Sequence, residues 1–236
     1  MASAPDLSDR SGVVRIANCS GFYGDRLSAM REMLTGGEVD FLTGDYLAEL
    51  TMLILGRDKM KHPDRGYAKT FLKQLEGCLG EAHDRGVRIV ANAGGLNPAG
   101  LAEAVRALTE RLGIPARIAH VEGDDLLARA AELGLGSPLT ANAYLGAWGI
   151  VDCLNDGADV VVTGRVTDAS VIVGAAAAHF GWAGPTTTNS PAPWSPVTSS
   201  SAASRPPAAT TPSSPTFPTS PTPVSRWPRS APTGPR

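Results

Sequence analysis

An arginine and two aspartates stand where a binding site for an acidic substrate could form. Asp45 follows the apolar run 39–42, while Arg165 and Asp168 follow the run 159–162. A guanidinium binds a carboxylate or phosphate through two parallel hydrogen bonds, and a carboxylate in apolar surroundings can exchange a proton with a substrate. We therefore predict Asp45, Asp168 and Arg165 as catalytic residues, with helix capping as the alternative role of each aspartate.

Three further loops carry polar side chains or paired glycines that could contact a ligand. Loop 18–26 turns from a strand into a helix, whose first backbone N–H groups attract anions, and the paired glycines of loop 92–98 allow close approach of a ligand. Loop 122–125 has three carboxylates, which could transfer protons, bind a divalent cation or only cap the next helix. The predicted ligand-binding residues are Asn18, Ser20, Gly21, Arg26, Asn92, Gly94, Gly95, Asn97, Glu122 and Asp124.

No known cofactor motif accompanies these loops. Their glycines form neither the G-x-G-x-x-G fingerprint nor a Walker loop, and the four histidines lack the spacing of metal ligands. We therefore predict no metal site, and the sequence leaves any cofactor unknown. Cys19 is either a nucleophile or an inert buried thiol, and the second role is favoured because no partner base is identifiable.

Short apolar runs alternate with helical patterns along the first 183 residues. Strands are predicted over 13–17, 39–42, 87–91, 116–121 and 159–162. Helices are predicted over 25–34, 46–55, 67–83, 98–112, 126–133, 145–154 and 169–180. This alternation predicts an α/β fold, in which a mostly parallel sheet lies between helices on both faces in a Rossmann-like three-layer arrangement. Ligands of such sheets bind at the carboxyl ends of the strands, where the polar loops described above are expected.

Composition divides the chain at residue 183. Residues 184–236 hold 14 of the 19 prolines and no Asp, Glu or Lys, so they cannot bury enough apolar surface to fold. They are predicted to be disordered, as are residues 1–12, which leaves 13–183 as one domain. Residues 1–183 carry a net charge of −6, which argues against nucleic-acid binding.

The chain shows no signal for a membrane or for export. No stretch is long and apolar enough to span a membrane, and the N-terminus lacks the pattern of a signal peptide. The three cysteines are far apart in sequence, which fits reduced thiols better than disulfide bonds. We therefore predict a cytoplasmic protein that binds neither membranes nor nucleic acid.

Residues 184–236 also admit interpretation as an out-of-frame translation. Because the first two bases of the Pro, Thr and Ala codons are known, two of the three bases of nearly every codon in a shifted reading frame are known as well. The shifted frame can then encode a sequence with the apolar periodicity, acidic residues and glycine turns of a folded protein. The domain of residues 13–183 would then be incomplete. The coding DNA around residues 183 and 184 tests this hypothesis, and an early stop codon in the alternate frame would exclude it.

Five sequence blocks, in order, resemble the acyclic terpene utilisation (AtuA) family. They are NCSGFYGDR, LTGDYLAELTMLIL, NAGGLNPAGL, HVEGDDLL and VVVTGRVTDAS, and the similarity runs from about Val14 to Ala183. The shifted-frame text also resembles the continuation of that family. The resemblance implies a truncated N-terminal domain of a cytoplasmic, bacterial-type protein of citronellol and geraniol breakdown, a process that runs through acyl-CoA intermediates.

The resemblance implies a small-molecule substrate, either a terpenoid acid or its CoA thioester, and leaves the reaction open. Arg26 and Arg165 would hold the anionic portion. The candidates for proton transfer are Asp45, Glu122, Asp124 and Asp168. The alternatives are a non-catalytic binding or assembly partner of a pathway carboxylase, and an inactive frameshifted product. The full-length form is expected as a homo-oligomer or in contact with a pathway enzyme.

Overall fold

The computed structural model describes residues 12–184, which contain a parallel sheet flanked by helices. In spatial order the strands are β1 (Ile16–Asn18), β2 (Phe41–Gly44), β3 (Arg88–Ala91), β5 (Val160–Thr163) and β4 (Ile118–Val121). Every neighbouring pair is parallel, so the carboxyl ends of the strands lie along one edge, the carboxyl edge of the sheet. Every residue of β2 and β5 is buried, as expected for strands covered on both faces.

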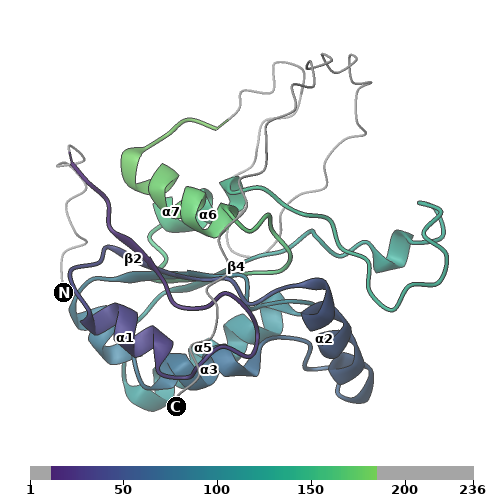
Figure 1. The fold of residues 1–236 in the computed structure, drawn as a ribbon, viewed down its shortest axis with the longest axis horizontal. Coiled ribbons are helices and arrows are strands. Elements are labelled where there is room, and N and C mark those ends of the chain that lie inside the picture. Colours follow the sequence, from purple (N-terminus) through teal and green to yellow (C-terminus); the bar gives the residue numbers. More distant parts are fainter. Residues whose placement is uncertain (1–11, 185–236) are drawn as a thin grey trace, which may run out of the picture. The chain divides into compact units, whose positions relative to one another are not determined.

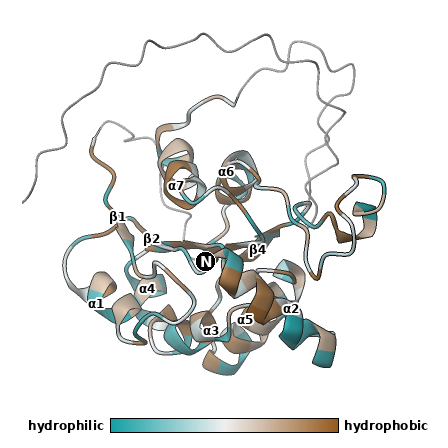
Figure 2. Ribbon diagram, turned by 45° about the vertical axis from the view of Figure 1, so that its right-hand side comes forward, coloured by the Kyte–Doolittle hydropathy of each residue, from teal (hydrophilic) through white to brown (hydrophobic). Residues whose placement is uncertain are grey.

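Helices cover both faces of this sheet (Figure 1). The helices on one face are α1 (Ala29–Thr35), α3 (Lys69–Glu76), α4 (Leu79–Asp84) and α5 (Pro98–Leu112), and those on the other are α6 (Trp148–Asn155) and α7 (Ser170–Phe180). One apolar cluster contains Met30, Phe71 and Leu101, and a second contains Ile150 and Val171. Figure 2 shows hydrophobic residues concentrated along the sheet between the two helical layers. A smaller cluster lies beneath α2 (Glu49–Lys61).

The predicted α/β class is confirmed, and each of the five predicted strands overlaps an observed one. The helix predicted over 98–112 has the predicted bounds, because Asn97 caps its first turn and Gly113 ends it in a left-handed conformation. The helix predicted over 46–55 instead begins at Glu49. Its start is later because Ala48 has an extended backbone, and the helix continues to Lys61.

The single helix predicted over 67–83 is wrong, because the chain forms α3 and α4 there. The break is at Gly77, whose carbonyl accepts a hydrogen bond from the guanidinium of Arg31 on α1. Glycine also has a low helix propensity. The contact between α1 and this turn joins residues far apart in the sequence, so the apolar periodicity of a helix cannot predict it.

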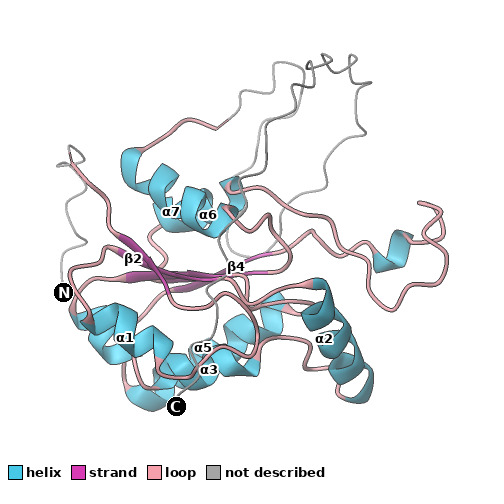
Figure 3. Cartoon of the chain, in the orientation of Figure 1, coloured by secondary structure: helices cyan, strands magenta, loops and turns pink. Residues whose placement is uncertain are grey.

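Residues 125–144 form an arm that leaves the sheet after β4 and returns before α6 (Figure 3). A single antiparallel bridge, between Asp125 and Asn142, joins its two ends. The helix predicted over 126–133 is wrong, because only one 3-10 turn (Leu127–Arg129) forms there. Leu127, Leu133, Leu135 and Leu139 of the arm are exposed, and a short helix without a packed face is marginal in water.

The predictions for the two ends of the chain fall outside the described residues, apart from Gly12 and Gly184. They comprise the predicted disorder of 1–12 and 184–236 and the out-of-frame interpretation. They stay predictions, as does the domain boundary at residue 183. Within residues 12–184, no helix combines the length and apolar character that crossing a membrane requires.

Candidate functional site

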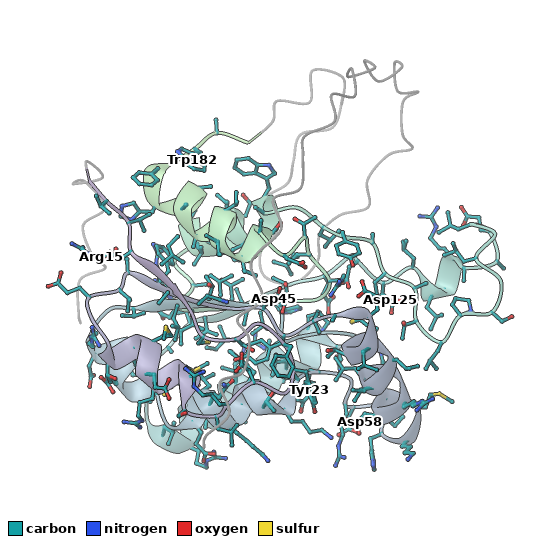
Figure 4. All side chains as sticks on the ribbon, viewed as in Figure 1. Arg15, Tyr23, Asp45, Asp58, Asp125 and Trp182 are labelled. Carbon is teal, nitrogen blue, oxygen red and sulfur yellow. The ribbon has the colours of Figure 1, made fainter. Side chains whose placement is uncertain are left out.

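Asp45 and Asn92 form the centre of the candidate site at the carboxyl edge. They follow the neighbouring strands β2 and β3, whose last residues pair in register. The Asn92 Nδ2 donates to Asp45 Oδ1 at 2.6 Å, and Asn92 Oδ1 accepts from the N–H of Tyr46 at 2.6 Å. Asn92 is fully buried and uses both ends of its amide, so it fixes the orientation of the Asp45 carboxylate. Figure 4 shows Asp45 between the two helical layers.

The environment of Asp45 favours its protonated form. Partial burial raises the pKa of its carboxyl, the hydrogen bond from Asn92 opposes that rise, and the charges of Asp168 and Arg165 act in opposite directions. The net effect is a raised pKa, which is the direction of change expected for a carboxyl that transfers protons. Arg165 and Asp168, the other two residues predicted to be catalytic, therefore both lie within electrostatic reach of Asp45.

Arg165 is the buried cation of this edge. It follows β5 and is only 5% exposed, and its Nη2 donates to the hydroxyl of Tyr144 and lies 3.4 Å from Glu49 Oε1. Its guanidinium carbon lies 4.4 Å from the centre of the Tyr144 ring, in a cation–π contact. Within residues 12–184, Arg165 Nη1 is buried and has no hydrogen-bond partner. A buried guanidinium N–H without a partner is costly and marks a place for an acceptor.

Asp124 ties the backbone of Arg165 to the arm. Its Oδ2 accepts from the N–H of Arg165 at 2.7 Å and from Asn142 Nδ2 at 2.9 Å. Burial raises the pKa of the Asp124 carboxyl, and these two hydrogen bonds oppose the rise. Both hydrogen bonds give Asp124 a positioning role between the end of β5 and the returning arm.

The first polar loop is held by its own hydrogen bonds. Asn18 Nδ2 donates to the carbonyl of Ser20 at 3.0 Å, and the N–H of Gly21 donates to Asp25 at 3.1 Å. Arg26 is exposed and forms an ion pair with Glu32 at 2.5 Å. The structure therefore brings Asn18 and Ser20 to the carboxyl edge but gives the Arg26 guanidinium a partner within its own loop and helix.

The glycine loop after β3 is shaped by packing. A Cβ on Gly94 would lie 2.6 Å from the carbonyl oxygen of Thr163, and Gly95 has a left-handed φ of 53° against the carbonyl of Gly66. Asn97 Oδ1 accepts from the N–H of Gly100 at 2.9 Å, as the N-cap of α5. These contacts explain the residue types of the loop through the close approach of β3, β5 and α5.

Glu122 lies beside a buried histidine rather than beside Arg165. Its Oε1 is 3.6 Å from His120 Nε2, and burial lowers the pKa of that imidazole. Within residues 12–184, no group of three or more His, Cys, Asp or Glu side chains is arranged to hold a metal ion. Burial raises the pKa of the Cys19 thiol to about 11, which disfavours the thiolate that a nucleophile requires.

Glu49, Asn142 and Tyr144 belong to the site but were not predicted from the sequence. Glu49 is the first residue of α2, after the loop that holds Asp45, and no local sequence pattern connects it with Arg165. Asn142 and Tyr144 come from the returning end of the arm, which no local pattern connects with Arg165.

The chain matches one protein family. The model of the family described as acyclic terpene utilisation family protein AtuA matches residues 14–189. None of the curated proteins matches the chain, and no solved structure matches it. The matched region includes every residue of the candidate site.

Proposed function

The chain belongs to the acyclic terpene utilisation (AtuA) family, and from that premise we propose that it is an enzyme acting on a terpenoid acid or its CoA thioester. Arg165 holds the carboxylate or the thioester carbonyl of the substrate. Asp45 accepts a proton from the substrate carbon next to that group and returns one to it. The reaction class is therefore proton transfer adjacent to a carbonyl.

The observation that carries this proposal is that a buried cation and a carboxyl with a raised pKa lie together at the carboxyl edge of the sheet. Among the described residues 12–184, the buried Nη1 of Arg165 has no hydrogen-bond partner, and the neighbouring Asp45 has a carboxyl with a raised pKa. Perturbed carboxyls next to a buried, unsatisfied cation are more typical of functional sites than of helix caps. Asn92 supports the role of Asp45 by fixing the carboxylate through its own amide.

The proposed location of the protein is the cytoplasm. The cysteines support this location, because Cys19, Cys78 and Cys153 are all free thiols. A cytoplasmic location also fits a CoA thioester as substrate.

Deuterium exchange tests the proposed reaction. The 236-residue chain is incubated with isovaleryl-CoA in deuterated water, and mass spectrometry follows deuterium entering the acyl group. We expect the wild-type chain to catalyse exchange and Asp45→Asn to slow it by about a hundredfold or more, the usual contribution of a positioned acid–base group. Asp152→Asn is the matched control, because Asp152 also has a pKa raised by burial but lies on α6.

Two results would count against the enzyme proposal. The first is the absence of exchange with the wild-type chain, and the second is equal exchange by the wild type and Asp45→Asn. The second result, with binding of the thioester retained, would favour the alternative of a non-catalytic binding or assembly partner of a pathway carboxylase.

A further inference from the structure

Glu49 occupies the position that a carboxylate ligand of Arg165 would take. Its Oε1 accepts from the hydroxyl of Tyr144 at 2.9 Å and lies 3.4 Å from Arg165 Nη2. The Glu49 side chain is 86% exposed, whereas the Arg165 side chain is 6% exposed. One partner of this ion pair can therefore move into solvent at little cost, and the other is fixed.

The geometry points to a carboxylate subsite formed by Arg165 and Tyr144, in which Glu49 is a built-in competitor that the ligand displaces. A ligand carboxylate would accept from Nη1 and Nη2 together, which gives Nη1 the acceptor that it lacks among residues 12–184. The Tyr144 hydroxyl, released from Glu49, would donate to the same ligand. This inference rests on the proposed function and narrows it, because it takes the terpenoid acid, rather than its CoA thioester, as the substrate whose carboxylate binds here.

The surrounding charges favour a ligand with a single negative charge. Asp45 and Glu49 both lie within electrostatic reach of Arg165, and Asp168 acts on Asp45 as well. A phosphate or a diphosphate would bring two or more charges into the field of these three carboxylates, with one guanidinium to offset them. A monocarboxylate brings one charge, the same as the Glu49 carboxylate that it replaces.

Tyr144 determines the orientation of the subsite. Its ring stacks on the guanidinium of Arg165, and its hydroxyl accepts from Nη2. Displacement of the Glu49 carboxylate, which lies 3.4 Å from Nη2, would open the edge of the guanidinium plane to an acceptor, the geometry that a carboxylate needs. Tyr144 ends the arm and is itself half-exposed, so a ligand can reach the subsite from the arm side.

Binding measurements on the 236-residue chain test this inference. Isothermal titration calorimetry is performed with isovalerate, with the neutral isovaleramide and with inorganic phosphate. We expect Glu49→Gln to bind isovalerate about two- to fivefold more tightly than the wild type, the size of effect found for exposed ion pairs. Arg165→Lys and Tyr144→Phe should each bind isovalerate more weakly than the wild type. The affinity for isovaleramide should not increase in Glu49→Gln.

Glu38→Gln is the matched control. The Glu38 side chain is also 86% exposed and also paired with an arginine, but it precedes β2 and so lies at the opposite edge of the sheet. Removing its charge changes the net charge by the same amount, and isovalerate affinity should stay at the wild-type value. An equal gain in isovalerate affinity in both variants would show that the effect comes from net charge alone, and it would overturn the inference.

A second measurement uses the wild-type chain. A hydrogen bond from its own backbone N–H lowers the pKa of the Glu49 carboxyl, and the contacts with Tyr144 and Arg165 lower it further. Displacement by isovalerate removes the last two contacts and should therefore raise that pKa. Carbon-13 NMR of labelled glutamate side chains follows this change. An unchanged Glu49 titration with isovalerate bound, or tighter binding of phosphate than of isovalerate, would overturn the inference.

The outcome is separable from that of the proposed enzyme reaction. A gain in isovalerate affinity in Glu49→Gln without deuterium exchange in the wild type would support the subsite and reject the reaction. Exchange that depends on Asp45, together with unchanged affinity in Glu49→Gln, would support the reaction and reject the subsite.

Discussion

Ionisation of the Asp45 carboxyl lowers the stability of the folded protein, because its surroundings raise the pKa of that carboxyl. Its carboxyl is partly buried next to the negative charge of Asp168, and the one side-chain amide that holds it belongs to the fully buried Asn92. A residue that is destabilising where it stands, and yet held by a dedicated partner, is typical of a functional site rather than of a helix cap.

The stability cost of Asp45 should appear as a pH dependence. Because the pKa of Asp45 is raised in the folded state, that state holds more protons than the unfolded state between the two pKa values. The free energy of unfolding contributed by this group therefore falls as pH rises through that window and stays reduced above it. We expect Asp45→Asn to be more stable than the wild type at pH 7 and to lose that advantage at about pH 3.

Urea unfolding of both proteins across this pH range measures the effect. Asp58→Asn is an informative control of opposite sign, since the hydrogen bond from Lys69 lowers the pKa of Asp58 and its charge is favourable in the folded state. Parallel pH profiles for Asp45→Asn and the wild type would contradict the prediction.

Single residues of the site differ in how far the sequence predicts them. Asp45 and Arg165 were predicted because each follows an apolar run that becomes a buried strand, and parallel strands deliver such residues to one edge. Tyr144 was not predicted, since its contact with Arg165 depends on the path of the arm. Arg26 was predicted to hold an anion, but its ion pair with Glu32 depends on where α1 begins.

The elements of the site meet through unusually close backbone approaches. Gly94 follows β3, and its N–H donates to the carbonyl of Thr163 at the end of β5 at 2.9 Å. A Cβ at this position would lie 2.6 Å from that oxygen and 2.8 Å from Pro98 Cα, which are backbone atoms of two different elements. The approach of β3, β5 and α5 therefore depends on the absence of a side chain at Gly94.

Gly94→Ala should destabilise the fold by about 1–3 kcal/mol, because the strands or α5 must shift to make room. Thermal and urea unfolding measure this loss. Gly37→Ala is the control, because Gly37 has open space around its Cα and no left-handed φ, so alanine should be neutral or slightly stabilising there. A Gly94→Ala variant as stable as Gly37→Ala would show that the loop relaxes freely.

The elements were predicted well where local pattern and tertiary packing agree. The helix over 98–112 carries its own start and stop residues, and the apolar run at 159–162 can only be buried. The prediction failed over 67–83, where an arginine of α1 interrupts the helix at Gly77, and over 126–133, where the predicted helix has no layer to pack against. Both failures come from contacts, or their absence, between distant parts of the chain.

Across the described part of the chain, burial and strand pairing predict that stability is concentrated in the sheet and is lowest in the arm. The strands β2, β3 and β5 have neighbours on both sides, and their residues are almost entirely buried. In the arm, residues 131–137 are all exposed, and one bridge joins its two ends. Because Asn142 and Tyr144 reach the site from this arm, the least stable segment is coupled to Arg165.

Amide hydrogen exchange should reveal this gradient. The amides of β3 and β5 can open only with the whole sheet, so we expect them to exchange at least about a thousandfold more slowly than those of residues 131–137, measured by NMR or mass spectrometry. Arm opening would also break the hydrogen bond from Asn142 to Asp124, so Asn142→Ala should speed exchange in the arm while leaving β3 unchanged. Equal protection in the arm and in β3 would mean that the arm unfolds only with the sheet, and access to Arg165 would then require another route.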